Sequence, residues 1–423
     1  MSVFKEYKLD ELYEIGSGLS KSADQFGFGQ PFLSFSDVFW NYFVPEKLSQ
    51  LVNSNEKEQL NHSVKKGDVF LTRTSETIEE LGMSTVALKD YPNATFNGFT
   101  KRLRPKTDDV VHPRFIGYYL RSPYFRAEVT AYSTLTTRAS LNNGIIERLK
   151  VKLPSFELQK KIASILSAYD DLIENNNRRI QLLEEMASEI YKEWFVRLRF
   201  PGYENIVYRD KDGKEIDREN ADAIPYGWKN GVIGDFVEFK KGKNITKNTV
   251  KEGNIPVVAG GLTPAYFHNK ANTKSPTMTI SASGANAGFV NLYYENIWAS
   301  DCSYLDSTMS ELFYYFYLTL KTRQKEIFHL QRGAAQPHVY PNDIMGLDLV
   351  FPDKNTVYDF EELIQPFMDE IGILQSKNQV LQETRDLLLP RLISGKLSVE
   401  HLLDEERLSM AAEPAAVYET NKE

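Results

Sequence analysis

The chain has 423 residues, of which 42% are hydrophobic and 26% are charged, with a formal net charge of -8 at pH 7. This length predicts more than one domain with buried cores. The single cysteine, Cys302, excludes an internal disulfide and a cysteine zinc site and fits a reducing compartment, so we expect a cytoplasmic protein. The opening MSVFKEYKLD lacks the apolar run of a signal peptide, and no stretch of about 18 apolar residues predicts a membrane span.

Local charge departs from the overall balance. Residues 101–152 contain 11 Lys and Arg against 4 Asp and Glu, and residues 229–270 contain 7 against 3. Residues 353–423 contain 7 against 15, so the negative charge is concentrated near the end of the chain. Because DNA binding depends on local basic patches, the net charge does not exclude a nucleic-acid partner.

The predicted elements follow the same order twice along the chain. Strands are expected over 68–74 and 84–88, a helix from Pro113, a polar loop over 133–143, and a strand ending at Pro154. In the second half, strands are expected over 277–283 and 288–294, a helix capped by Ser310, a polar loop over 331–341, and a strand ending at Pro352. A shift of 198 residues superimposes these elements, which indicates an internal repeat.

A long helix follows each half. Apolar residues recur at alternating steps of four and three from Ile162 to Trp194 and from Phe360 to Leu392, which is a heptad pattern. Each seam contains one asparagine, Asn176 or Asn378, and we hypothesise that these set the register of an antiparallel helix pair. The alternative is that each asparagine faces solvent. Pro366 should kink the second helix or make it start late.

The fold class expected is α/β (α+β), with two similar domains at opposite ends of an antiparallel pair of long coiled-coil helices and a pseudo-twofold repeat. The predicted segments are a first domain over 1–154, a central helical spacer over 155–199, a linker over 200–228, a second domain over 229–352, a carboxyl-terminal helical spacer over 353–400, and a disordered tail over 401–423.

Motifs for catalysis are missing from the sequence. There is no Pro-Pro pair of the kind that an aminomethyltransferase loop needs, and none of the Gly-Lys pairs continues into a phosphate-binding loop. The six histidines are scattered, so no metal site is predicted. Asp235, Glu238 and Lys240 match a nuclease site only faintly, and a strand edge is the simpler interpretation. The chain is therefore predicted to be non-catalytic.

Polar loops and basic runs are the expected DNA contacts, since phosphates bind Lys and Arg, and base edges bind Arg, Asn, Gln, Ser and Thr. In the first domain they are Arg73, Thr74, Ser75, Lys101, Arg102, Arg104, Thr136, Thr137, Arg138, Asn142 and Asn143. In the second domain they are Lys240, Lys241, Lys243, Ser281, Ser283, Asn286, Arg332, Gln336 and His338. Ordinary solvated loops are the alternative for any one of them.

The chain resembles the specificity subunits of type I restriction–modification systems. The resemblance rests on KVKLPSFELQKKIASILSAYDDLIENNNRRI, on FVRLRFPGYEN followed by AIPYGWKNGVIGDFVEFKKGK, on RGAAQPHVYPNDIMGLDLVFP, and on ETRDLLLPRLISGKL. It implies that each domain is a target-recognition domain that reads one half of a bipartite double-stranded DNA target, while the helical spacer sets the gap. It also implies that two adenine-methyltransferase subunits and the restriction subunits dock on this chain. S-adenosylmethionine, ATP and Mg²⁺ would bind those partners, and this chain would hold no cofactor.

Two other classes of protein stay open at this point. A stand-alone nuclease with duplicated domains would lose metal-dependent cleavage when Asp235 or Glu238 is replaced. A scaffold whose basic patches meet acidic proteins would not bind duplex DNA.

Overall fold

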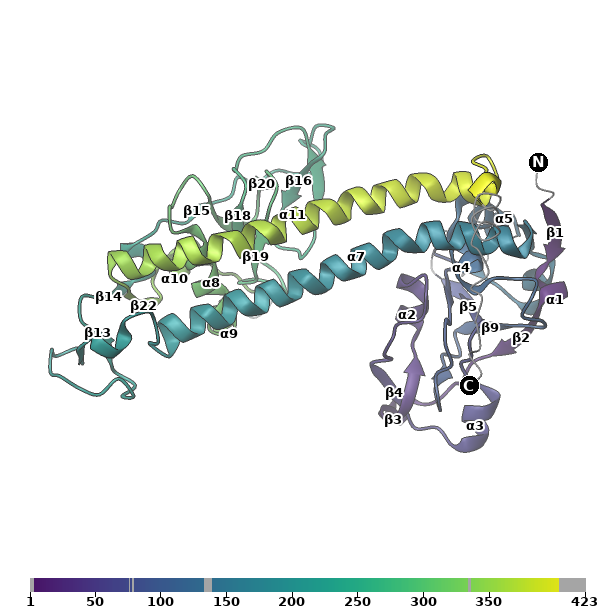
Figure 1. The fold of residues 1–423 in the computed structure, drawn as a ribbon, viewed down its shortest axis with the longest axis horizontal. Helices are drawn as coiled ribbons and strands as arrows, with labels where there is room; N and C mark the ends of the chain where they lie inside the picture. The colour runs from purple at the N-terminus through teal and green to yellow at the C-terminus, as the bar shows by residue number, and fades with distance from the viewer. Residues whose placement is uncertain (1–3, 76, 78–79, 133–138, 334–335, 403–423) are drawn as a thin grey trace, which may run out of the picture. The chain divides into compact units, whose positions relative to one another are not determined.

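The computed structural model describes residues 4–75, 77, 80–132, 139–333 and 336–402. The chain forms two compact units, each of which includes part of both long helices (Figure 1). Unit 1 comprises Met1–Glu174 and Asn378–Glu423, and unit 2 comprises Asn175–Lys377. The predicted domain borders instead separate the helices from the domains, and most of the predicted tail lies outside the described residues.

Unit 1 contains short strands and helices before the first long helix. Its elements are β1 (Lys5–Lys8), α1 (Leu9–Leu12), β2 (Tyr13–Ser17), η1 (Ala23–Gln25), β3 (Phe26–Leu33), α2 (Phe35–Trp40), β4 (Gln50–Val52), α3 (Glu56–Asn61), β5 (Val69–Thr72), β6 (Thr74–Ser75), β7 (Ser84–Val86), β8 (Thr95–Phe96), β9 (Thr100–Pro105), α4 (Pro113–Arg121), α5 (Pro123–Tyr132), β10 (Ala139–Ser140), α6 (Asn143–Arg148) and β11 (Lys150–Leu153). The long helix α7 (Phe156–Tyr191) begins in unit 1 and α11 (Lys354–Ile393) ends there.

Unit 2 contains the rest of both long helices and a second set of short elements. These are η2 (Lys192–Val196), η3 (Tyr203–Asn205), β12 (Tyr208–Arg209), β13 (Ile224–Pro225), β14 (Lys229–Val232), η4 (Ile233–Asp235), β15 (Lys240–Lys241), β16 (Ile255–Val258), β17 (Tyr266–His268), β18 (Thr277–Ser281), β19 (Val290–Tyr293), β20 (Trp298–Ala299), β21 (Cys302–Asp306), α8 (Phe313–Thr322), α9 (Gln324–His329), α10 (Pro341–Met345) and β22 (Asp348–Phe351). The predicted strands over 68–74, 84–88, 277–283 and 288–294 are confirmed as β5, β7, β18 and β19.

The strand pairing of unit 1 is repeated in unit 2. Unit 1 has a four-stranded antiparallel sheet in the order β2-β9-β5-β7, and unit 2 has the order β15-β21-β18-β19. Each unit also has a three-stranded sheet with one parallel pair, β4-β3-β8 and β17-β16-β20. The first and last strands of each half pair as well, β1 with β11 and β14 with β22. The predicted internal repeat is therefore a repeat of topology.

The short helices that follow each sheet differ from the prediction in detail. The helix expected from Pro113 breaks at Ser122, which is extended because the next residue is Pro123. Ser310 does not cap the second helix, which begins at Phe313, and its Oγ accepts a hydrogen bond from the backbone N–H of Leu312 at 3.1 Å. A carboxylate from the long helix α11 replaces it, because both oxygens of Glu361 accept backbone N–H groups of the first turn of α8.

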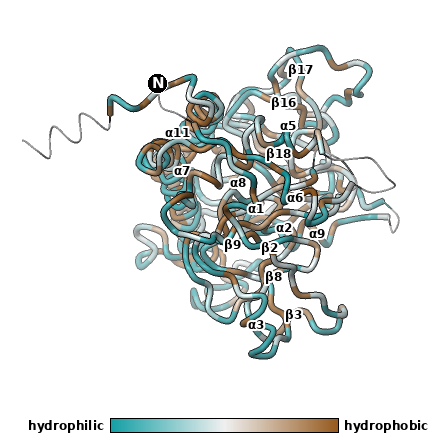
Figure 2. The backbone as a smooth tube through the Cα atoms, turned by 90° about the vertical axis from the view of Figure 1, so that its right-hand side faces the viewer, coloured by the Kyte–Doolittle hydropathy of each residue, from teal (hydrophilic) through white to brown (hydrophobic). Residues whose placement is uncertain are grey.

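In each unit a segment of α7 and a segment of α11 pack against the short helices. The core of unit 1 includes Leu158, Ile162, Leu166, Leu389 and Leu392, and the core of unit 2 includes Ala187, Tyr191, Phe360, Ile364 and Ile371. In Figure 2, which looks along the two long helices, both tubes carry hydrophobic and hydrophilic residues. The helix α11 continues through Pro366 and starts at Lys354, so the late start allowed for by the prediction is wrong.

The two seam asparagines are buried, with 9% of Asn176 and 7% of Asn378 exposed, so the solvent-facing alternative is wrong for both. Their pairing across the helices stays a prediction. The two helix segments of unit 2 run antiparallel, since Arg179 on α7 pairs with Glu370 on α11 at 2.7 Å, and Tyr191, later on α7, packs against Phe360, earlier on α11. In unit 1 Asp170 on α7 pairs with Arg385 on α11. No helix in the described part of the chain is long and apolar enough to cross a bilayer.

Candidate nucleic-acid interface

Three loops of unit 1 come together where its four-stranded sheet ends. We call residues 73–75, 97–99 and 139–143 loop cluster 1. The strand β6 pairs with β10, so Thr74 lies opposite Ser140 and Ser75 opposite Ala139. The backbone of Arg73 joins the other two loops, since its N–H donates to Phe99 O at 3.0 Å and its carbonyl accepts the N–H of Leu141 at 2.8 Å. The structure thus brings together the predicted contacts at 73–75 with Asn142 and Asn143, while Thr136, Thr137 and Arg138 lie outside the described residues.

Three loops of unit 2 meet in the same way. We call residues 281–286, 300–301, 332–333 and 336–340 loop cluster 2. Ser283 forms an antiparallel bridge with His338, and His338 and Arg332 exchange backbone hydrogen bonds at 2.9 and 3.0 Å. The predicted contacts Ser281, Ser283, Asn286, Arg332, Gln336 and His338 therefore belong to one cluster.

Matching backbone hydrogen bonds show which residues occupy structurally equivalent positions in the two clusters. The N–H of Ala282 donates to Asp301 O at 3.1 Å, and Ala282 O accepts the N–H of Val339 at 3.0 Å. Arg73 makes the same two bonds with Phe99 and Leu141 in unit 1. Ala282 thus corresponds to Arg73, and Asp301 corresponds to Phe99.

Next to each cluster, a glycine allows two backbone segments to pack closely against each other. A Cβ on Gly18 would lie 2.1 Å from the Asn97 carbonyl oxygen, and one on Gly242 would lie 2.2 Å from that of Ser300. Only glycine permits this approach of two backbones. Gly18 and Gly242 are therefore packing positions beside the two clusters.

Exposed cations surround loop cluster 2. Lys240, Lys241 and Lys243 are exposed, and Lys241 lies opposite Ser303 in the sheet. The side chain of Arg332 is 73% exposed and its Nη2 lies 2.6 Å from Asp343 Oδ1. The Asp343 carboxylate is only 7% exposed, whereas the guanidinium keeps further N–H donors on its exposed side, where a phosphate could bind.

The basic run predicted in unit 1 lies on β9, where all three side chains have partners inside the unit. Arg104 donates to Asp68, which is fully buried, with an Nη2–Oδ2 distance of 2.6 Å. Arg102 donates to the carbonyl oxygens of Asn61 and Ser63. Lys101 donates to Ser17 Oγ at 2.8 Å, and burial lowers its pKa, with the Arg73 charge adding to the effect. These contacts stabilise the sheet, and phosphate binding by the three stays a prediction.

Two residues of the clusters, Phe99 and Asp301, are not among the DNA contacts predicted from the sequence. Phe99 is 62% exposed although it is aromatic, and Asp301 lies beside exposed lysines although it is acidic. In the sequence, Phe99 stands in an ordinary turn and Asp301 next to Cys302. Only the backbone bonds to Arg73 and Ala282 place them in the clusters.

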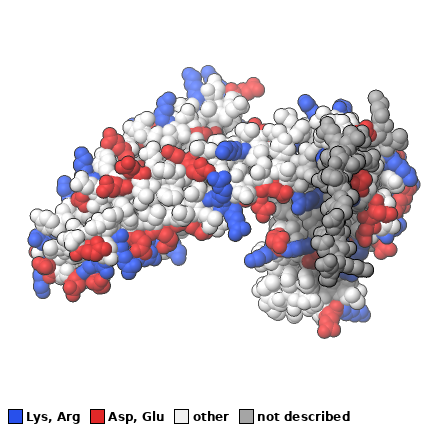
Figure 3. Space-filling model, viewed as in Figure 1, with Lys and Arg blue, Asp and Glu red and all other residues white. Residues whose placement is uncertain are grey.

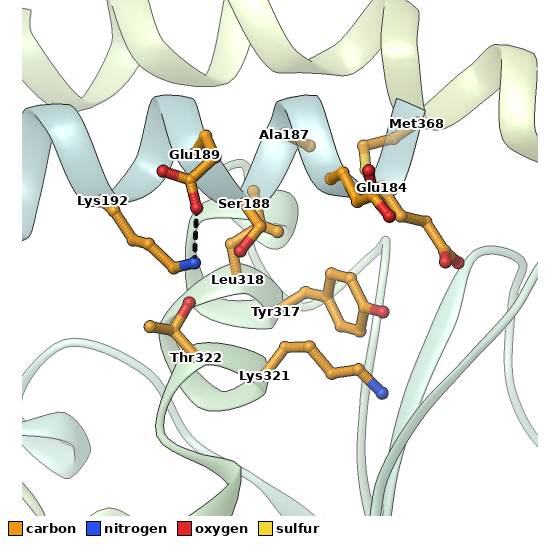
Figure 4. Close-up of a pocket in the computed structure, with 11 residues that line it drawn as sticks. Glu184, Ala187, Ser188, Glu189, Lys192, Tyr317, Leu318, Lys321, Thr322 and Met368 are labelled. Carbon is orange, nitrogen blue, oxygen red and sulfur yellow. Dashed lines mark hydrogen bonds and ion pairs between the residues drawn. The ribbon is translucent and has the colours of Figure 1, made fainter. Parts of the chain in front are cut away.

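A pocket of about 440 Å³ lies between α7 and α8 in unit 2 (Figure 4). Tyr317 and Lys321 point into it from α8, opposite Glu184 and Ser188 of α7. Burial lowers the pKa of Lys321 and raises that of Glu184. The charges of Lys321 and Glu184 partly compensate each other across the pocket.

The surface from the end of α7 through η2, beside this pocket, carries charges of both signs. Arg197 pairs with Glu189 and Glu193, and Lys192 pairs with Glu189. Figure 3 shows acidic and basic side chains intermixed along this part of unit 2. A mixed surface of this kind favours a protein partner over a phosphate backbone.

The residues considered for a nuclease site have structural contacts. Asp235 Oδ2 accepts the backbone N–H of Val232 at 2.9 Å, and Glu238 is exposed. Among the described residues, no three His, Cys, Asp or Glu side chains gather in a metal-binding arrangement.

Known proteins place the chain in a family. The family model for the type I restriction modification DNA specificity domain matches residues 1–185 and 225–383. A type I restriction enzyme specificity subunit of Methanocaldococcus jannaschii is 26% identical over 422 residues, which cover 93% of this chain and 94% of the relative. The HindI specificity subunit of Haemophilus influenzae is 22% identical, over 94% of this chain and all of the relative.

A crystal structure of a type I restriction–modification S subunit from M. genitalium has the same fold. It superimposes with a TM-score of 0.56 at 15% identity and covers 92% of this chain and 96% of its own. The family model covers most of the chain and matches once in each half, as the repeat of strand pairing requires. The chain belongs to the type I restriction–modification specificity subunits, the non-catalytic family whose members recognise the DNA target.

Proposed function

We propose that this chain reads a bipartite double-stranded DNA target, with loop cluster 1 on one half and loop cluster 2 on the other. The observation that carries this proposal is the backbone equivalence of the two clusters, which presents two sets of polar side chains on the same topology. Two equivalent but chemically different sets suit a target whose halves differ in sequence. The gap between the halves would be set by the long helices.

The same proposal includes the partners. Two DNA adenine-methyltransferase subunits would dock on the helical spacers, and restriction subunits would join through them, in the cytoplasm. Leu182 on α7 and Val380 on α11 are 50% and 61% exposed and stand 198 residues apart, which is the repeat shift. Exposed apolar side chains at equivalent positions fit two copies of one partner. The methyltransferases would hold S-adenosylmethionine, and the restriction subunits ATP and Mg²⁺.

The experiment that tests this proposal is expression of the chain with the adenine-methyltransferase subunits of the same organism, followed by mapping of methyladenine in the host DNA. We expect a motif in two parts with methyladenine in both, and its disappearance when this chain is omitted. Methylation that does not depend on this chain would contradict the proposal.

A single substitution tests the assignment of the halves. Arg332→Ala removes the exposed guanidinium of loop cluster 2, so binding should weaken in the half-target that unit 2 reads. If the arginine contacts a phosphate, the slope of log affinity against log salt should fall by about 1. Lys211→Ala, in the linker of the same unit, is the matched control. Equal affinity and slope for Arg332→Ala and wild type would remove this residue from the interface.

A further inference from the structure

The equivalent positions Phe99 and Asp301 differ in chemistry, and this difference points to how unit 2 selects its half-target. Both residues have the same backbone bond to the neighbouring loop, so the fold requires neither side chain at this place. Phe99 exposes an aromatic ring, whereas Asp301 has a carboxylate next to a hydroxyl. The side chain at this position is therefore free to determine specificity.

The carboxylate of Asp301 is oriented and still has acceptor capacity. Ser283 Oγ donates to its Oδ2, and the strand bridge between Ser283 and His338 holds the hydroxyl in place. No other hydrogen bond or ion pair to this carboxylate is found among the described residues, although a carboxylate accepts about four. Asp68 in unit 1 is the contrast, since it is fully buried and two of its hydrogen bonds come from Arg104.

Asp301 places a negative charge in a basic surface, and this charge opposes DNA binding unless the carboxylate has a specific partner on the DNA. Lys243 N donates to Ala299 O and Gly242 N to Cys302 O, so the lysine-rich segment 240–243 runs beside the loop that carries Asp301. The carboxylate forms no ion pair with these lysines in the described structure. Next to phosphates such a charge is repulsive, and a hydrogen-bond donor on a base of the DNA would offset this cost.

We propose that Asp301, oriented by Ser283, accepts a hydrogen bond from the exocyclic amine of a cytosine in the half-target read by unit 2. Carboxylates recognise the N4 amine of cytosine in the major groove. Guanine and thymine present acceptors at this edge, and adenine places the N7 acceptor beside its N6 amine, which repels a carboxylate. Loss of the carboxylate should relax selection at that base pair. This inference rests on the proposed function of the two loop clusters.

The test uses the full chain with its methyltransferase subunits, in a host that lacks other adenine methylation. The methylated motif is mapped for wild type, Asp301→Asn, Ser283→Ala and Phe99→Ala. We expect Asp301→Asn to lower discrimination at one G·C pair of one half-target by about 5-fold or more, because the amide also donates. Ser283→Ala keeps the carboxylate but removes the hydroxyl that orients it, so discrimination at the same G·C pair should fall to a smaller extent. Phe99→Ala should leave this half-target unchanged.

Asp359→Asn is the matched control, because it makes the same chemical change at an exposed position of α11 in unit 2. A second measurement is binding of the purified complex to an unrelated duplex, which should strengthen in Asp301→Asn because a repulsive charge is lost. Identical motifs for wild type, Asp301→Asn and Ser283→Ala would overturn the assignment, as would relaxation at an A·T pair. If the wild-type complex itself produced no bipartite motif, the proposed function would fail as well.

Discussion

At the scale of residues, buried polar side chains of the long helices fix the short helices. Gln159 of α7 accepts the backbone N–H of His112, the residue before α4, at 2.9 Å. Glu361 of α11 accepts the N–H groups of Tyr314 and Tyr315 at the start of α8, both at 2.8 Å. Helix starts leave N–H groups unpaired, and here the neighbouring helix supplies the acceptor. Each short helix is thereby held to the spacer beside it.

The Glu361 contact should make the stability of unit 2 depend on pH. Burial raises the pKa of this carboxyl to about 7, above its ordinary value of 4.5. The folded unit therefore holds a proton that the unfolded chain releases between these values, so this stability is full below pH 4.5 and lost as pH rises through about 7. We expect the thermal midpoint of wild type to fall between pH 5 and 8 more steeply than that of Glu361→Gln.

The same residue is also the acceptor for two buried N–H groups, those of Tyr314 and Tyr315. Glu361→Ala leaves two buried N–H groups without an acceptor and should cost about 2 kcal/mol or more. Faster hydrogen exchange at the Tyr314 and Tyr315 amides would locate the loss. Parallel pH profiles for wild type and Glu361→Gln would show that the carboxyl does not titrate in this range.

Contacts inside the units also distinguish the structural role of one arginine from the exposed position of another, although the sequence predicts both as DNA contacts. Arg104 belongs to the most basic stretch of the chain, but it neutralises the buried Asp68. Arg332 also lies in a segment predicted to contact DNA, and its side chain is 73% exposed. Sequence identifies cations, but their partners come from strands far away in the chain. The sequence therefore predicts the group of residues that contains a binding site, but it does not predict which members of the group are free to bind.

At the scale of elements, the long helices were the most predictable part. The heptad pattern places Ile162, Leu166, Ile364 and Ile371 in buried positions, as the structure confirms. A repeated period over many turns is a strong signal. The strands β3 and β4 lacked such a signal, because FGFGQPFL contains glycines and a proline and its first four residues are exposed. Pairing with β8, a distant strand, makes this segment extended.

The regular helices permit a test of the spacer as a ruler. Deletion of seven residues from each of α7 and α11 preserves the heptad phase, and therefore the packing, while it removes about 10 Å of helix. The gap between the two target halves should shrink by about 3 base pairs, as read from the methylation motif. Deletion of five residues from each helix breaks the phase and should abolish assembly. An unchanged gap after the seven-residue deletion would contradict the ruler.

At the scale of the whole molecule, the topological repeat fits the proposal that two copies of one partner subunit dock on the chain. Each unit repeats the strand order of the other, and each contains segments of both long helices. Two equivalent surfaces imply two equivalent docking sites. The polar loops, by contrast, differ between the units, because each half-target demands its own side chains.

The exposed apolar residues of the repeat lead to a prediction about assembly. Leu182→Asp and Val380→Asp each place a charge on one proposed docking surface and should remove one methyltransferase subunit from the complex, while the double variant should remove both. Multi-angle light scattering of the purified complex measures the stoichiometry. Lys377→Asp, at an exposed position of α11, is the control. Full assembly by the double variant would place the docking surface elsewhere.

The sequence by itself determined the repeat, the heptad helices, the four best strands and the family, because each of these leaves a local or periodic pattern. It also located most residues of the two loop clusters as polar segments. Tertiary structure decided which side chains meet. It paired Arg104 with Asp68, joined Glu361 to α8, and placed Phe99 and Asp301 at equivalent positions. Those contacts join residues distant in the chain, and no local pattern encodes which distant partner a side chain will find.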